Sequence, residues 1–98
     1  PTPGHTDGSM ALLLWDQRSV LFSGDHVWWN REQGVLVCSE CYCWWDFSLQ
    51  IRSLERLQPL DVAWLLPGHG HRHAFAPQAW SEAVHQTLNW IRTQDEQL

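Results

Sequence analysis

Two apolar segments of this chain each end in a tight turn that is followed by a residue able to bind a metal ion. Residues 20–22 run into Ser23-Gly24-Asp25, and residues 62–66 run into Pro67-Gly68-His69. Short apolar runs bounded by Gly and Pro predict buried strands. We therefore expect a fold in which two strands deliver Asp25 and His69 to a sheet edge, although Gly-Asp after a strand is also ordinary turn chemistry.

A third loop, residues 1–9, is rich in Pro and Gly and contains His5. Residues 10–15 form an apolar run of strand length, and the polar residues 16–19 make a connection of hairpin length into residues 20–22. Antiparallel pairing of these strands would return the chain to the edge from which it started. We therefore expect His5 and Asp25 to be neighbours.

Two helices are expected in the second half of the chain. Residues 46–59 carry apolar side chains on one face, with Gln50, Arg52, Glu55 and Arg56 on the other, and Pro59 ends the pattern. Pro77 suits the first turn of a last helix, in which His85 is expected to be solvated. The apolar faces consist of Phe47, Ile51, Leu54 and Leu57 in the first helix and Trp80, Val84, Leu88 and Ile91 in the second.

Composition excludes two classes of partner. The chain has 98 residues, which is one domain at most, a net charge of -5 and no lysine, so we expect no nucleic-acid surface. No apolar run approaches the roughly 18 residues of a membrane span, so no membrane contact is expected. Cys38, Cys41 and Cys43 form no even-numbered disulfide framework, which favours a reducing, cytoplasmic setting with buried or loop thiols over a cysteine metal site.

The middle of the chain is dense in aromatic residues. Trp28, Trp29, Trp44 and Trp45 lie there beside Tyr42, and they are half of the eight tryptophans. They are expected to cap the core or to face a missing partner half. The alternative is that they line the apolar wall of a substrate pocket, which makes Tyr42 a candidate substrate contact.

Imidazole and carboxylate groups are the ligands that suit zinc, manganese or iron, and a carboxylate can bridge two ions. Two metal ions a few ångströms apart can hold a hydroxide and supply the nucleophile for hydrolysis. Isolated surface histidines are common, but three glycine-flanked loops at strand ends are difficult to assign to chance. His5, Asp25 and His69 therefore form the candidate metal site.

The chain resembles the C-terminal half of a metallo-beta-lactamase-fold hydrolase, with the glyoxalase II-like branch closest. The matching motifs are Thr-Pro-Gly-His-Thr-Asp-Gly-Ser at 2–9, Phe-Ser-Gly-Asp at 22–25 and Leu-Leu-Pro-Gly-His-Gly at 65–70. The resemblance implies that His5 binds a first metal ion, Asp25 bridges both and His69 binds the second. It also implies an α/β fold, an αββα sandwich to which residues 1–98 contribute about one sheet with its helices.

The chain departs from this family in one respect. The motif His-x-His-x-Asp-His, which supplies four of the usual seven ligands, does not occur in it. We therefore expect the missing half upstream of Pro1, a parent protein that is a metal-dependent hydrolase with two divalent ions, zinc first, and an inactive 98-residue chain. His71 and His73 are interpreted as exposed loop residues or second-layer contacts. His26 is expected at the surface, or else orienting Asp25 or the substrate.

The expected substrate is a small molecule with an ester, thioester or lactone-type bond, attacked by the metal-bridging hydroxide. Two other readings stay open. An iron-containing redox relative of the same fold is favoured slightly by the cysteine cluster. A non-catalytic binding module would use the tryptophan-rich middle as its contact surface.

Overall fold

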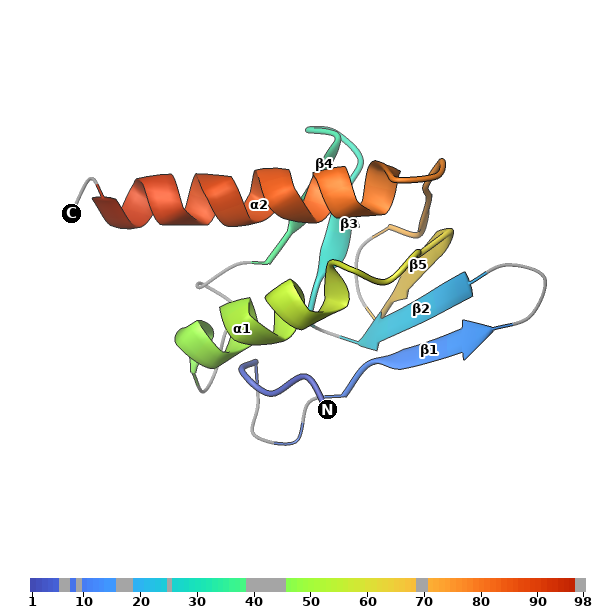
Figure 1. Ribbon diagram of the computed structural model, residues 1–98, viewed down its shortest axis with the longest axis horizontal. Coiled ribbons are helices and arrows are strands. Elements are labelled where there is room, and N and C mark those ends of the chain that lie inside the picture. The colour runs from blue at the N-terminus through green and yellow to red at the C-terminus, as the bar shows by residue number, and fades with distance from the viewer. Residues whose placement is uncertain are drawn as a thin grey trace.

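The computed structural model describes residues 1–5, 8, 10–15, 19–24, 26–38, 46–68 and 71–96. These residues form an α/β fold in which a four-stranded sheet, a two-stranded sheet and two helices pack together (Figure 1). The elements in chain order are β1 (Leu12–Trp15), β2 (Ser19–Gly24), β3 (Trp28–Asn30), β4 (Val35–Val37), α1 (Phe47–Leu57), β5 (Trp64–Pro67), β6 (His73–Ala74) and α2 (Ala79–Glu96).

The larger sheet has the strand order β1-β2-β5-β6 and is mixed. β1 and β2 pair antiparallel with Leu13 opposite Leu21, and β2 and β5 pair parallel with Leu21 opposite Leu65. The predicted hairpin and the two predicted strands are therefore confirmed. β3 and β4 form a separate antiparallel ribbon, with Trp29 opposite Leu36.

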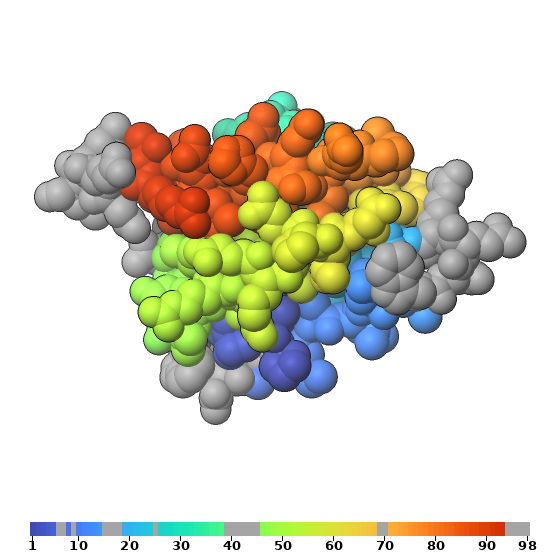
Figure 2. Space-filling view, viewed as in Figure 1, coloured from blue at the N-terminus to red at the C-terminus, as the bar shows by residue number. Residues whose placement is uncertain are grey.

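Both helices contribute to one core with one face of the larger sheet. Leu21 and Leu65 belong to the same buried cluster as Leu54 of α1 and Val84 of α2. α1 and α2 pack against each other, as the green-yellow and orange-red atoms show in Figure 2. Within the described chain, neither helix is long and apolar enough to cross a membrane.

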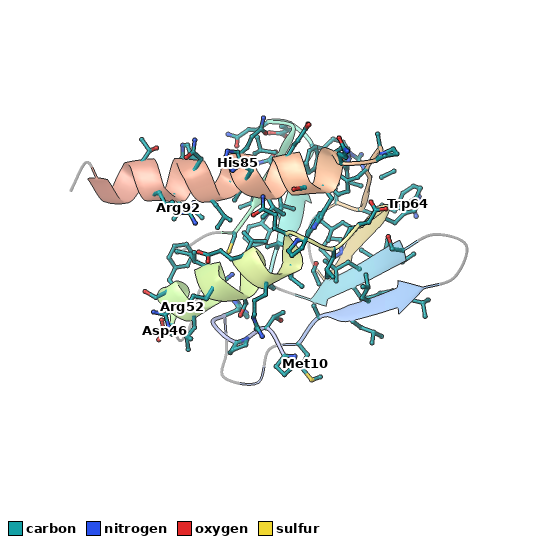
Figure 3. All side chains as sticks on the ribbon, viewed as in Figure 1. Met10, Asp46, Arg52, Trp64, His85 and Arg92 are labelled. Atoms are coloured by element: carbon teal, nitrogen blue, oxygen red, sulfur yellow. The ribbon has the colours of Figure 1, made fainter. Side chains whose placement is uncertain are left out.

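The other face of β1 and β2 is apolar and exposed. Leu12 and Leu14 of β1 are 64% and 49% exposed, and Phe22 of β2, which pairs with Leu12, is also exposed. Met10 extends this surface at the edge of the molecule opposite α2 (Figure 3). The expectation that residues 20–22 are buried throughout is therefore wrong, because alternate side chains of a strand point to opposite faces and the helices cover only one.

Both predicted helices are confirmed, with two corrections. α1 begins after its N-cap Asp46, whose Oδ1 accepts a hydrogen bond from the Leu49 N–H at 3.1 Å. Gln50, predicted to lie on the solvent face, is only 1% exposed because the N-terminal loop packs over it. α2 begins at Ala79 rather than at Pro77, since the left-handed backbone of Gln78 (φ 70°) separates the proline from the helix.

Trp80 joins the two helices and provides a test of the core. Its Nε1 donates to the Leu57 carbonyl of α1 at 2.9 Å, and its ring meets that of Phe75 edge-on. We expect Trp80→Phe to lower the free energy of unfolding by about 1–3 kcal/mol in urea denaturation, because a buried bond and core volume are lost. Trp90 on the same helix is exposed, so Trp90→Phe should change the free energy of unfolding by less than about 0.5 kcal/mol. Equal losses would contradict this packing.

Candidate functional site

The carboxyl ends of β2 and β5 meet at one edge of the larger sheet. Gly24 pairs with Pro67, and the Gly68 N–H donates a hydrogen bond to the Gly24 carbonyl at 2.7 Å. These two glycines directly precede Asp25 and His69 in the sequence. Asp25 and His69 themselves lie outside the described residues.

The turn after β2 is fixed by its own hydrogen bonds. Gly24 has a φ of 58°, which favours glycine, and an irregularity in the pairing with β5 falls between Phe22 and Gly24. Ser23 is fully buried and its Oγ donates to the Val27 carbonyl at 2.8 Å, while the His26 N–H donates to the Ser23 carbonyl at 3.1 Å. The chain therefore enters and leaves position 25 through anchored residues.

The loop that carries His5 is attached to α1. Gly4 has a φ of 143° and lies so close to the helix that a Cβ there would be 2.3 Å from the backbone of Gln50. The Gly4 carbonyl accepts the Asp46 N–H at 2.8 Å, and the Pro3 carbonyl accepts Ser53 Oγ at 2.8 Å. Only glycine fits this contact, because any side chain would collide with the helix.

The same helix also holds the turn after β2. Gln50 Nε2 donates to the His26 carbonyl at 2.8 Å, and both side chains are 1% exposed. The ring nitrogens of His26 have no hydrogen-bond partner among the described residues. The expectation of a surface histidine at position 26 is therefore wrong: the Ser23–Val27 turn directs it beneath the N-terminal loop.

The charge state of His26 follows from its position. Burial, followed by the nearby charges of His5 and Arg56, lowers the pKa of His26 from 6.5 to about 4. His26 is therefore neutral near pH 7. The loop before His5 and the Ser23–Val27 turn both lie against Gln50 of α1, which brings the first predicted loop towards the end of β2.

The residues that follow position 70 lie against the β3–β4 ribbon. His71 is exposed and forms an isolated bridge with Trp29, whose ring stacks on that of His73 at 3.7 Å between centroids. Phe75 meets both rings edge-on, and burial lowers the pKa of His73. The ribbon therefore fixes the segment after His69 as α1 fixes the other two loops.

Several of the predicted site residues lie outside the part of the chain that the structure describes. Tyr42, Cys41 and Cys43 lie outside the described residues, and Cys38 is buried in the core. In the ranges that the structure describes, no three His, Cys, Asp or Glu side chains form a group able to hold a metal ion. Of the three predicted ligands, His5 alone falls within those ranges.

Sequence reasoning missed Gln50, although a signal for it existed. Gln50 lies three residues after Phe47 and four before Leu54, so it belongs to the same helical stripe as these apolar residues. A polar residue within such a stripe indicates a buried hydrogen bond. Gly4 carried a weaker signal, since glycine in a loop also serves many turns.

No model of a known protein family matches the chain.

The buried His26 predicts that stability depends on pH. The pKa of His26 is about 4 in the folded state and 6.5 in the unfolded chain. Between pH 4 and pH 6.5 the unfolded chain therefore binds more protons than the folded protein. The metal-free protein should therefore lose about 2 kcal/mol of unfolding free energy between about pH 7.5 and pH 5 in urea denaturation. His26→Gln should weaken this dependence, and His85→Gln, at an exposed position of α2, should leave it unchanged. An identical pH dependence in all three proteins would refute the prediction.

Proposed function

We propose that this chain is the C-terminal half of a metallo-beta-lactamase-like domain whose parent protein is a metal-dependent hydrolase. The observation that carries the proposal is the hydrogen bond between Gly68 and Gly24 at the ends of two parallel strands. Asp25 and His69 each follow one of these glycines. We infer from this that the carboxylate and the imidazole leave the sheet at a common edge.

The loop of His5 supports the same proposal from another direction. It is held on α1 by Gly4, and α1 in turn binds the His26 carbonyl through Gln50. One helix thus supports the residue that precedes His5 and the residue that follows Asp25. A donor set of two imidazoles and one carboxylate fits zinc, and it fits manganese or iron as well.

The residues have distinct roles in the proposed chemistry. Following the family resemblance, His5 would hold a first divalent ion, His69 a second, and Asp25 both. When bound, such ions lower the pKa of water and polarise a carbonyl group. Attack of water at the carbonyl carbon would yield an acid and an alcohol from an ester, an acid and a thiol from a thioester, and a hydroxy acid from a lactone. The proposed substrate is therefore a small acyl compound.

Three donors do not complete a site for two ions. We propose that the others come from a preceding half with the His-x-His-x-Asp-His motif, and we call the two halves together the full-length protein. The exposed face of Leu12, Leu14 and Phe22 supports this proposal, since a second sheet of an αββα sandwich would cover it. The proposal thus gives one explanation for the incomplete donor set and for the uncovered sheet face.

Asp25→Ala in the full-length protein tests the metal site. Loss of the shared carboxylate should abolish hydrolysis and lower the zinc, manganese or iron content, measured by elemental analysis of the purified protein. Asp61→Ala is the matched control, because Asp61 is an exposed aspartate before β5 and should affect neither quantity. Unchanged turnover of Asp25→Ala would overturn the assignment.

The exposed sheet face gives a second test. One double substitution should make the 98-residue chain more soluble and the full-length protein less stable. The 98-residue chain alone should self-associate and bind a hydrophobic dye, and Leu12→Thr with Leu14→Thr should reduce both effects. The same pair should destabilise the full-length protein by about 2–5 kcal/mol, since the two leucines are covered there. A 98-residue chain that stays a monodisperse monomer and binds no hydrophobic dye would contradict the proposal.

A further inference from the structure

Gln50 of α1 lies between the loop before His5 and the Ser23–Val27 turn. Its backbone is packed against Gly4, and its Nε2 donates to the His26 carbonyl at 2.8 Å. We propose that Gln50 is a positioning residue that fixes the loop before His5 relative to the described residues of the Ser23–Val27 turn, and thereby sets the affinity of the proposed site for a divalent metal ion. The inference rests on the proposed function and adds to it a residue that contacts no ligand itself.

Three other hydrogen bonds of the described residues hold one segment each. Ser53 Oγ and Arg56 Nη2 of α1 donate to the carbonyls of Pro3 and Pro1, so they reach the N-terminal loop only. Ser23 Oγ closes the turn onto Val27. Gln50 meets the N-terminal loop at its backbone and Cβ and the turn at its amide, so we infer that the amide bond holds the turn in place against the loop.

The environment of Gln50 makes this contact costly to lose. Gln50 and His26 are both 1% exposed, so water cannot replace the hydrogen bond without entering the interior. Gln50 Oε1 and the His26 ring nitrogens are also buried, and they have no hydrogen-bond partner among the described residues. Unsatisfied buried polar atoms are rare in cores, so each calls for an explanation, and we infer that a junction fixed by the Gln50–His26 bond supplies one.

The test compares Gln50→Met with Thr87→Val in the full-length protein. Methionine keeps the length of the side chain and its preference for helix but cannot donate to the His26 carbonyl. Thr87 on α2 also makes a buried bond, from Oγ1 to the Leu36 carbonyl of β4 at 2.6 Å, which touches neither loop. Both variants should therefore have a lower free energy of unfolding than the wild type, and only Gln50→Met should also have a lower affinity for the metal ion.

Zinc affinity is measured by competition with a chromophoric chelator. Gln50→Met should weaken zinc binding about 10- to 100-fold, the range found when residues that orient metal ligands are replaced. Thr87→Val should stay within about 2-fold of the wild type, since it lies in a different part of the core. Wild-type affinity in Gln50→Met would overturn the positioning role.

A measurement without metal separates this inference from the proposed function. If the wild-type protein binds no zinc, manganese or iron, the proposed function fails. Hydrogen–deuterium exchange of the metal-free protein then still tests Gln50. Residues 1–5 and 22–28 should both exchange faster in Gln50→Met than in the wild type, and neither segment should exchange faster in Thr87→Val. Faster exchange in one segment only, or in none, would show that Gln50 does not couple the two.

Discussion

The parallel pairing of β2 with β5 is the constraint on which the rest of the described structure depends. Leu21 and Leu65 face each other across this pair, yet they are separated in sequence by a ribbon and a helix. Parallel strands cannot be joined by a tight turn, so the chain between them must cross over and pack on the sheet. That crossover places α1 against the core, and it aligns the ends of both strands at the edge where Gly24 and Gly68 are bonded.

α1 then determines the arrangement of everything near that edge. Its apolar residue Leu54 faces the core, and its polar residues Gln50 and Ser53 are buried as well, because they bind backbone carbonyls of the neighbouring loops. Such bonds are favourable only if the loops approach closely, which the absence of a side chain at Gly4 permits. The helix therefore stabilises the fold with one part of its surface and orients the candidate site with another.

The sequence predicted the elements well and their environments less well. Apolar periodicity located both helices and the hairpin, because these depend on residues close in sequence. It placed Gln50 in solvent and His26 at the surface, and both are buried, because the loop that covers them comes from residues distant in sequence. The candidate ligands were identified from the glycines beside them and from their places at strand ends, and the structure describes the residues next to Asp25 and His69.

The composition of β1 connects the uncovered face to the chemistry of the site. Leu12, Leu13 and Leu14 are apolar on both faces of the strand, whereas an antiparallel strand with one solvated face alternates apolar and polar residues. We infer that both faces of this sheet are buried in the full-length protein. In the described structure the helices cover one face. A second layer over Leu12 and Phe22 would also exclude water beside the edge after Gly24, where a lower dielectric strengthens the attraction between a cation and a carboxylate. In the proposed full-length protein, completing the sandwich would therefore also strengthen the proposed metal site.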